Sequence, residues 1–471
     1  MKNLLTKKNI IIALIIYYIS AGVFYYAAYN RIYYTEYRNG VSELTGYVEE
    51  LVDGSEIIQD IFVDCDYIYS MRVRVATFGR KNQGTIELLF EDENGNILKN
   101  EKYKASKIED NSDLIFHINK SIPSGTYRIK IKAEGAGLGQ AITVYYNDKD
   151  TTFGEQFTIN GEVKNGSILL TVEGGIYRTY GIMFWPIVLV IGVILYLHFN
   201  RCIKLNSEKK KNVTIRMIDI LAKYKFLIKQ LVERDFKSKY KRSTLGVCWS
   251  LLYPVLLMAV QYVIFSTIFR ANIENYPVYL LSASVLFTFF SDSVGAGLMA
   301  IVGNASLITK VYVPKYIYPV SKVLSTGINL VLSMVPLLIV VLITGGKITR
   351  AYLLIPFVFL CILIFCIGMS FLLSASMVFF RDTQFLWSVV TMLWMYATPM
   401  FYPESVIPER WSIILTANPM YHYISFLRTI LMRGISPNIM EYLYCMGLSL
   451  LVLGAGVFVY KKTQDKFVLY I

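Results

Sequence analysis

The sequence is poor in the residues from which metal sites and disulfide frameworks are built. It holds three histidines and six cysteines in 471 residues. His117, His198 and His422 are too far apart for a local zinc motif. Cys65 is the lone cysteine of a long polar region, and the other five lie in or near apolar segments. We therefore expect neither a metal ion nor an extracellular disulfide.

The motifs of several enzyme classes are absent as well. The sequence has no Gly-x-Ser-x-Gly elbow for a nucleophilic serine and no Gly-x-x-x-x-Gly-Lys-Ser/Thr loop for nucleotide phosphates. Residues 345–349 contain Gly-Gly-Lys without that spacing, and no helical pattern follows the glycines of 135–139. We expect a chain that is not an enzyme, holds no cofactor and does not hydrolyse ATP by itself.

Charge is scarce too, because charged residues make up 17% of the chain and hydrophobic residues 55%. Several uncharged runs reach the roughly 20 residues that cross a bilayer core of about 30 Å. The sequence therefore predicts a polytopic α-helical membrane protein. The eight candidate spans are Ile10–Tyr29, Ile182–Phe199, Trp249–Phe269, Tyr276–Val302, Val323–Thr344, Ala351–Phe380, Phe385–Phe401 and Tyr442–Tyr460.

Basic residues beside these spans indicate the orientation. Lys2, Lys7 and Lys8 precede the first span, and fourteen Lys or Arg lie within Arg201–Arg242. By the positive-inside rule both flanks are cytoplasmic, the region between them is outside, and eight spans return the C-terminus to the cytoplasm. The net charge of +13 lies beside spans, so we expect contact with anionic membrane lipids and no nucleic-acid partner.

The region between the first two spans has a different character. Residues 71–75, 85–90, 127–131 and 142–146 alternate between apolar and polar, and 93–96 and 123–125 supply turns. These patterns predict an antiparallel β-sandwich. Two roles stay open for it, carbohydrate binding or service as a spacer on the membrane part.

A basic amphipathic segment, Ile215–Arg242, leads directly into the third span. Apolar residues recur at helical spacing at Tyr224, Ile228, Leu231 and Phe236, with lysines between them. Such a helix either lies on the membrane and receives a partner protein, or only obeys the positive-inside rule.

Five segments carry a resemblance to a known family. They are Arg234-Asp235 with Tyr240, Gly246, Trp249 and Pro254; the stretch Lys310 to Pro319; Arg381-Asp382; Thr398 to Pro403, with Pro399; and Asn418-Pro419 followed by Arg428. Their order is similar to that in the type-2 ABC permeases that export O-antigen and teichoic acid, over Ile215 to Ile471. Lys239 stands where that family leads us to expect arginine.

The resemblance implies partners and a mechanism. A transporter half without a nucleotide site needs a cytoplasmic ABC ATPase, which would bind ATP and Mg²⁺, and two copies of each chain form the exporter. A lipid-linked polysaccharide would then leave along the interface of the permease homodimer. The expected ATPase-facing residues are Arg234, Asp235, Lys237, Lys239, Tyr240, Lys310, Pro314, Lys315 and Pro319.

Within such a path the sequence offers aromatic residues more than charges. An intramembrane carboxylate is a functional candidate, although the serines beside Asp292 make helix packing an alternative. The proline-rich stretch from Pro399 to Pro419 predicts a re-entrant pair of short helices at the outer mouth. The candidates for the pore or its gate are Phe287, Phe290, Asp292, Trp394, Tyr396, Phe401, Tyr402 and Trp411.

The expected organisation runs in five parts: 1–30, a cytoplasmic tip and signal-anchor helix; 31–180, the extracellular β-sandwich; 181–200, a second transmembrane helix; 201–245, the basic linker and interface helix; and 246–471, a six-span permease bundle. The alternative is a membrane sensor with an extracellular ligand domain, and a multi-span glycosyltransferase is a third possibility. The sensor reading is weakened because no output domain follows the second span.

Overall fold

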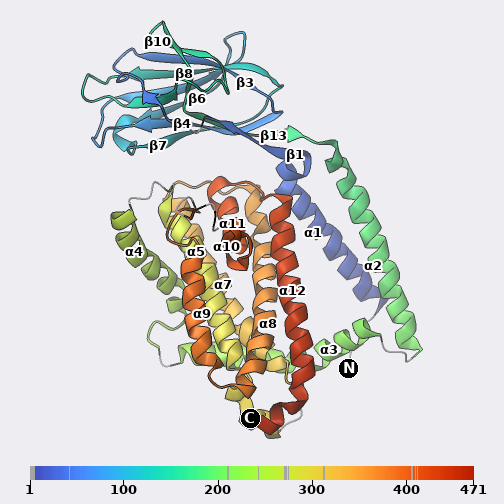
Figure 1. Ribbon diagram of the computed structural model, residues 1–471. Helices are drawn as coiled ribbons and strands as arrows, with labels where there is room; N and C mark the ends of the chain where they lie inside the picture. Colours follow the sequence, from blue (N-terminus) through green and yellow to red (C-terminus); the bar gives the residue numbers. More distant parts are fainter. Residues whose placement is uncertain are drawn as a thin grey trace. The chain divides into compact units, whose positions relative to one another are not determined.

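The computed structural model describes residues 6–41, 43–208, 212–241, 243–269, 273, 275–310, 313–404, 407–408, 410 and 412–470. Within them the chain forms two compact units, which are labelled by their elements in Figure 1. One unit is Asn30–Phe184, and the other joins the residues from Trp185 onward to the N-terminal residues up to Tyr29.

The first unit is built of strands. Their bounds are β1 Tyr34–Gly40, β2 Gly46–Tyr47, β3 Glu56–Val63, β4 Tyr67–Ala76, β5 Thr85–Glu91, β6 Ile97–Lys104, β7 Ser112–Ser121, β8 Gly125–Glu134, β9 Thr143–Asn147, β10 Gln156–Ile159, β11 Glu162–Asn165, β12 Ser167–Ile168 and β13 Leu170–Tyr177. The four alternating runs of the sequence coincide with parts of β4, β5, β8 and β9, which confirms the strand prediction.

All strand pairs are antiparallel and form two sheets. One sheet has the order β1-β13-β4-β9-β12, with β2 paired to β9 and β7 to β4, and the other has the order β11-β10-β3-β8-β5-β6. One apolar core contains Ile57 and Ile129 of the second sheet and Val73 and Val172 of the first, all fully buried. Alternate residues of each strand face this core, so the antiparallel sandwich is confirmed.

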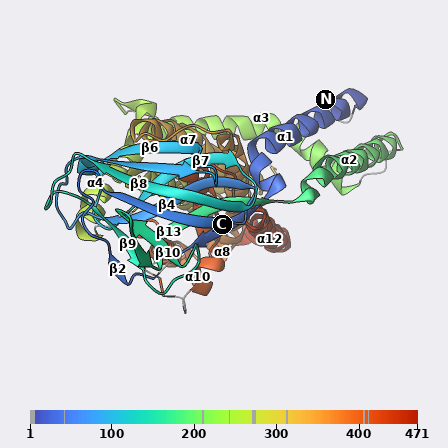
Figure 2. The ribbon, with the colours of Figure 1, turned by 90° about the horizontal axis from the view of Figure 1, so that it is seen from above.

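The second unit is helical. Its helices are α1 Lys7–Tyr33, α2 Phe184–Ser207, α3 Val213–Tyr240, α4 Trp249–Phe269, α5 Tyr276–Leu298, α6 Ala305–Lys310, α7 Ile317–Ile343, α8 Ile355–Phe379, α9 Thr383–Ala397, α10 Ser412–Thr416, α11 Pro419–Arg428, α12 Ile439–Thr463 and α13 Phe467–Tyr470. The helices α1 and α2 lie side by side in two perpendicular views (Figures 1 and 2). The Tyr17 hydroxyl donates to the Val188 carbonyl at 3.0 Å.

Seven helices of the described chain are long and apolar enough to cross a membrane: Lys7–Tyr29, Gly181–Ser207, Gly246–Phe265, Tyr276–Leu298, Ile317–Ile343, Arg350–Phe379 and Ile439–Tyr470. The predicted eighth continuous span, Phe385–Phe401, is wrong in that form. The helix α9 has 15 residues, or about 22 Å at 1.5 Å per residue. A non-helical segment around Pro399 follows it, and proline favours an extended conformation in the residue before it.

The start of α7 also differs from the prediction. The sequence places Pro319 in a cytoplasmic loop and begins the span at Val323, whereas α7 begins at Ile317. Proline fits the first turn of a helix because the N–H that it lacks has no intrahelical partner there. The loop before α7 is therefore shorter, and Pro319 belongs to the helix.

Small residues bring three helices into close contact. A Cβ added at Gly297 of α5 would lie 2.1 Å from Ser370 Oγ of α8, and one added at Gly456 of α12 would lie 2.3 Å from the Gly368 carbonyl of α8. Ser449 Oγ of α12 also donates to the Cys361 carbonyl at 2.8 Å. Close backbone approach through small residues is how helices pack in membranes, where no hydrophobic force drives them together.

We predict that Gly456→Val lowers the stability of the helical unit, because the new side chain meets backbone that cannot move aside. The cost should reach or exceed the roughly 1–3 kcal/mol typical of overpacking. Gly454→Val is the matched control, since a Cβ there has nothing within 4 Å. Thermal midpoints in detergent should separate the two variants, and equal midpoints would contradict the close α8–α12 contact.

Candidate functional site

The amphipathic helix α3 lies against α7 and buries its apolar face. Leu231 is 5% exposed and shares a small core with Ile301 and Tyr318, against which Tyr224 and Ile228 also pack. Three of the four apolar positions expected from the sequence, Tyr224, Ile228 and Leu231, therefore form the packed face. Lysines of the same helix remain exposed, and the side chain of Lys237 is 78% exposed.

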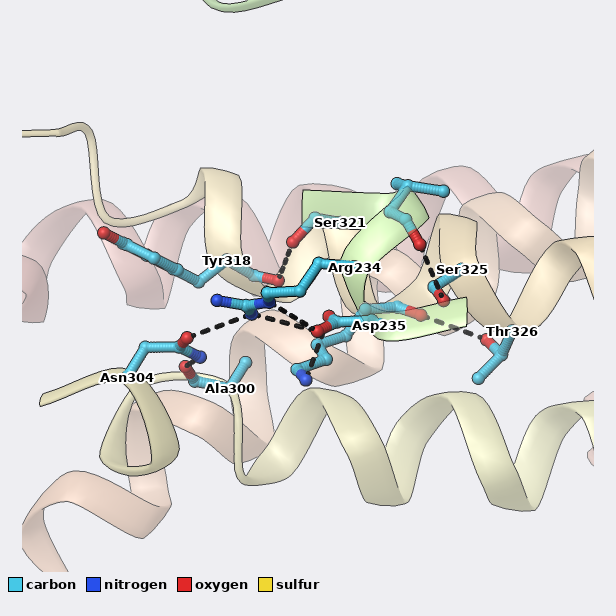
Figure 3. A network of polar contacts seen from close by, with 10 residues as sticks. Arg234, Asp235, Ala300, Asn304, Tyr318, Ser321, Ser325 and Thr326 are labelled. Atoms are coloured by element: carbon cyan, nitrogen blue, oxygen red, sulfur yellow. Dashed lines mark hydrogen bonds and ion pairs between the residues drawn. The ribbon is translucent and has the colours of Figure 1, made fainter. Parts of the chain in front are cut away.

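A polar network fixes the last turns of α3 to the bundle (Figure 3). The carboxylate of Asp235 pairs with Arg234 at 2.9 Å and with Lys322 of α7 at 2.9 Å. Arg234 also donates to Asn304 Oδ1 at 3.3 Å, and Asn304 donates to the Ala300 carbonyl at 2.8 Å. One carboxylate with two cations therefore joins α3, α7 and the segment after α5.

Two further contacts extend this network along α3. Lys239 Nζ lies 3.3 Å from Asp292 Oδ2 of α5, and the Tyr240 hydroxyl donates to Asn329 Oδ1 of α7 at 2.7 Å. Asp292 is thus a partner of α3 rather than an isolated carboxylate within a span, and Ser293 beside it makes the packing contact, with Thr326 at 2.6 Å.

These three helices surround a pocket of about 250 Å³. Its lining includes Asp235, Lys239, Asp292, Lys322 and Asn329. Four of these side chains form two of the ion pairs described above, Asp235–Lys322 and Lys239–Asp292, so positive and negative charges balance within the lining. The polar lining of this pocket lies between the end of α3 and the helices α5 and α7. Ion pairs as well as apolar packing therefore hold α3 against the bundle.

The loop before α7 faces the same end of the bundle. Lys315 Nζ donates to the Gln464 carbonyl at 2.6 Å and lies 5.8 Å from the centre of the Phe467 ring. Its ammonium group is thus engaged within the chain, whereas Lys310 is exposed. The ends of α3 and α12, the helix α6 and residues 313–316 consequently belong to one end of the bundle.

A buried arginine organises the opposite end. Arg428 of α11 is 7% exposed and donates to the carbonyls of Pro399, Met400 and Tyr279 at 2.9, 3.2 and 3.2 Å. Its guanidinium lies over the Tyr279 ring, and the Tyr279 hydroxyl donates to the Pro399 and Tyr402 carbonyls. Arg428 and Tyr279 therefore tie the segment after α9 to the first turn of α5.

Asn418 separates α10 from α11. Its Oδ1 accepts from the Met420 amide at 3.0 Å, which caps α11, and from Trp394 Nε1 at 2.7 Å. Its Nδ2 donates to Thr398 Oγ1 at 2.8 Å. Pro419 takes the first helical position, where proline is favoured. Of the pair of short helices predicted between Pro399 and Pro419, α10 lies within that stretch, whereas α11 begins at Pro419 and runs beyond it. Their position at an outer mouth remains a prediction.

The pattern of the ABC-2 type transporter family matches residues 226–432. An O-antigen export system permease protein of Myxococcus xanthus is 32% identical over 255 residues, covering 54% of this chain and 98% of that protein. Two proteins of the same description from Klebsiella pneumoniae are 32% and 30% identical over 235 and 234 residues, covering 49% of this chain and 90% of each.

The chain belongs to the ABC-2 type transporter permeases. The matched region begins within α3 and ends after α11, so it includes both the α3 network and the Arg428 cluster. The β-unit, Asn30–Phe184, lies outside it. Five segments that carried the resemblance in the sequence thus lie at the two ends of one helical bundle.

The structure places several aromatic candidates of this permease inside the helix packing. Phe290 is fully buried against Phe365, Trp387 and Trp394, with ring centroids 5.1–6.1 Å apart. Phe287 is also buried. In the single chain these rings pack between α5, α8 and α9. This arrangement favours a role in helix packing over a role in lining a pore.

The remaining gate candidates lie toward the Arg428 end. Phe401 is buried and stacks on Phe265 at 4.8 Å, and the Tyr402 hydroxyl donates to the Tyr396 carbonyl at 2.7 Å. The Tyr396 side chain is exposed. Trp411 lies outside the described residues. A role for these residues in a pore or gate remains a prediction.

Most of the other residues of the family resemblance lie at helix ends or in the loops between helices. Gly246 has φ +52°, in the left-handed region that favours glycine, just before α4 begins at Trp249. Pro254 is buried within α4. Arg381 and Asp382 are exposed between α8 and α9, and Pro314 lies in the loop before α7.

The sequence did not reveal which residues of the bundle pair with α3. Asn304, Lys322 and Asn329 accept or pair with residues of α3 that are 70 to 89 positions away. The only signal was the polar character of these side chains beside or within apolar segments, which did not identify their partners.

Proposed function

We propose that the chain is the membrane-spanning permease subunit of an ATP-binding cassette exporter. It moves a lipid-linked cell-surface polysaccharide, an O-antigen-like glycan or a teichoic acid, outward across the cytoplasmic membrane. The observation that carries the proposal is the alignment with almost the whole length of an O-antigen export permease. The α3 network, which lies in the matched region, supports it by giving a surface that a partner could move.

The energy for transport comes from a separate cytoplasmic ATPase that binds ATP and Mg²⁺. The exposed face of α3 and the segment around α6 form the receiving surface in this proposal. The polar network then carries displacement of α3 into α5 and α7 as a rigid-body movement. Two permease chains form a homodimer, and the polymer passes along their interface.

The basic end of the bundle is cytoplasmic in this proposal, because α3 and the end of α12 carry its lysines and arginines. The β-unit is then extracellular or periplasmic, since it lies between the spans α1 and α2. The Arg428 end, with α10 and α11, becomes the outer mouth. The chain itself makes no covalent change in its substrate.

We predict that cysteines placed at Lys237 and Lys310 crosslink to the ATPase, because both positions are exposed on the proposed receiving surface. Lys315 is a poorer position, since its side chain is held by Gln464. The background should carry Cys248→Ser, because Cys248 is the exposed cysteine among the described residues. Disulfide or bismaleimide crosslinking in isolated membranes is the measurement.

The matched control is a cysteine at Ile343, which is 78% exposed at the opposite end of α7 and should not crosslink. An assembled complex in which neither Lys237→Cys nor Lys310→Cys crosslinks would exclude the proposed interface. The function itself is tested by removing the chain from its cells: surface polysaccharide should disappear while its lipid-linked precursor accumulates inside. Unchanged surface polysaccharide would refute the export function.

A further inference from the structure

An exposed phenylalanine in the β-unit has a backbone conformation that bulky side chains avoid. Phe78, in the loop between β4 and β5, has φ +57° and is 45% exposed. The other non-glycine residues with positive φ in the described chain are asparagines, which tolerate this region much better. Phe78 is therefore the exceptional case, and strain of this kind often marks a functional loop.

Hydrogen bonds to the Asp110 carboxylate hold the loop in this conformation. Asp110 Oδ1 accepts the amide of Thr77 at 2.6 Å and its hydroxyl at 3.1 Å. Burial alone would raise the pKa of Asp110, but hydrogen bonds from the amides of Thr77, Phe78 and Gly79 outweigh it and lower the pKa. A carboxylate that stays ionised thus fixes the turn that presents the Phe78 ring.

The ring is also fixed from the side. The Arg80 guanidinium lies 5.1 Å from the centre of the Phe78 ring and is held by Glu50, by Asn82 Oδ1 at 3.1 Å and by the Ala141 carbonyl at 3.3 Å. Tyr47, which is 60% exposed, meets Phe78 edge to face at 5.5 Å. Two exposed rings therefore form a rigid corner beside a paired arginine and glutamate.

We propose that this corner, Tyr47 with Phe78 over Arg80, is a saccharide-binding site for the exported polysaccharide. A sugar ring has apolar C–H faces, which pack on aromatic rings, and hydroxyl groups at its edge, which bond to polar groups such as those around Arg80. The identity of the ligand as the exported polymer rests on the proposed function. The site gives the β-unit a role outside the region that the permease family shares.

The composition of the corner argues for this occupant. Arg80 pairs with Glu50, so the site does not supply the unpaired positive charge that attracts an anionic membrane. Two rings offer at most about 300–500 Å², since one aromatic side chain buries roughly 150–250 Å². A stable protein partner needs about 800 Å² on each side, whereas a sugar unit fits two rings.

The test uses the full chain in lipid nanodiscs and the polysaccharide released from the surface of its own cells, with dextran as the control polymer. Biolayer interferometry should show that the wild type binds the polysaccharide, and that Phe78→Gly and Tyr47→Ala each weaken binding at least tenfold. Phe78→Gly should leave thermal stability unchanged or raised, because glycine adopts the left-handed conformation without strain. A merely structural ring would instead lower stability when removed.

Phe62→Ala is the matched control, since Phe62 is a 55% exposed ring on strand β3, and it should leave binding unchanged. The proposal is overturned if the wild type does not bind its polysaccharide, if Phe78→Gly binds normally, or if the variants instead lose vesicle binding or self-association. A chain that exports polysaccharide but does not bind it refutes this inference alone. A chain whose loss leaves surface polysaccharide unchanged refutes the proposed function.

Discussion

Cells that carry Arg428→Met are expected to lose their surface polysaccharide almost completely. Methionine fills much of the same space but cannot donate to the carbonyls of Pro399, Met400 and Tyr279. Each buried carbonyl left without a donor costs about 1–3 kcal/mol. The Pro399 carbonyl keeps its hydrogen bond from the Tyr279 hydroxyl. The main consequence should therefore be that the segment around Met400 is no longer held in place against α5.

Two variants separate charge from geometry at this site. Arg428→Lys keeps the positive charge but replaces a planar fork by a single ammonium group, so we expect partial export. Tyr279→Phe removes the hydroxyl donor to Pro399 and Tyr402 and keeps the ring under the guanidinium, so its effect should be smaller than that of Arg428→Met. The measurements are surface polysaccharide per cell and the yield of permease–ATPase complex. Normal export by Arg428→Met would show that the buried arginine is dispensable.

The second large effect is expected from Asp235→Asn, which should uncouple ATP hydrolysis from export. Asparagine keeps the shape of the side chain but removes the charge that balances Arg234 and Lys322. Because the Asp235 side chain is only 12% exposed, the contacts between α3 and α7 should lose about 1.5–3 kcal/mol of stabilising free energy, which is typical of a hydrogen bond to a charged group. The complex should still assemble and hydrolyse ATP, while export falls at least tenfold.

The outcome can be tested by a double-mutant cycle. Adding Lys322→Met to Asp235→Asn removes the unpaired cation, and export should recover in part, because a buried ion pair is harmed most by losing one partner. Lys102→Gln is the control: its exposed pair with Glu134 at 3.5 Å lies in the β-unit, outside the proposed ATPase surface, so the change should cost little. If ATPase activity and export fall together with the amount of complex, Asp235 serves folding and not coupling.

Much of the architecture was predictable from the sequence. Long uncharged runs identify spans because every helix that crosses a bilayer must be apolar. Period-two alternation identified the sandwich because each sheet buries only one of its two faces. The end of α9 and the start of α7 were wrong for a related reason. Hydropathy records only polarity, so it extended α9 across the apolar residues around Pro399. It also excluded the first six residues of α7, which end at Lys322.

The pairings within the site could not be predicted in the same way. Lys239 and Asp292 are 53 residues apart and Arg428 and Tyr279 are 149 residues apart, and no periodicity links residues on different helices. Lys315 shows the opposite difficulty. Its position in a basic loop suggested a partner surface, but the folded chain uses the ammonium group to hold the end of α12. The strained backbone of Phe78 left no trace in the sequence, since phenylalanine is not a turn residue.

The contact between Gly368 and Gly456 decides where this bundle is able to deform. Backbones that touch through glycines cannot slide past each other without first separating. We therefore expect α8 and α12 to move as one rigid pair, and the close contact at Gly297 attaches α5 to it. The helices α4 and α9 instead present wide rows of exposed apolar side chains, Leu256 and Val260 on one and Leu386 and Leu393 on the other. We therefore expect the bundle to deform along α4 and α9, so that a long polymer would enter sideways between helices and not through a central hole that widens evenly.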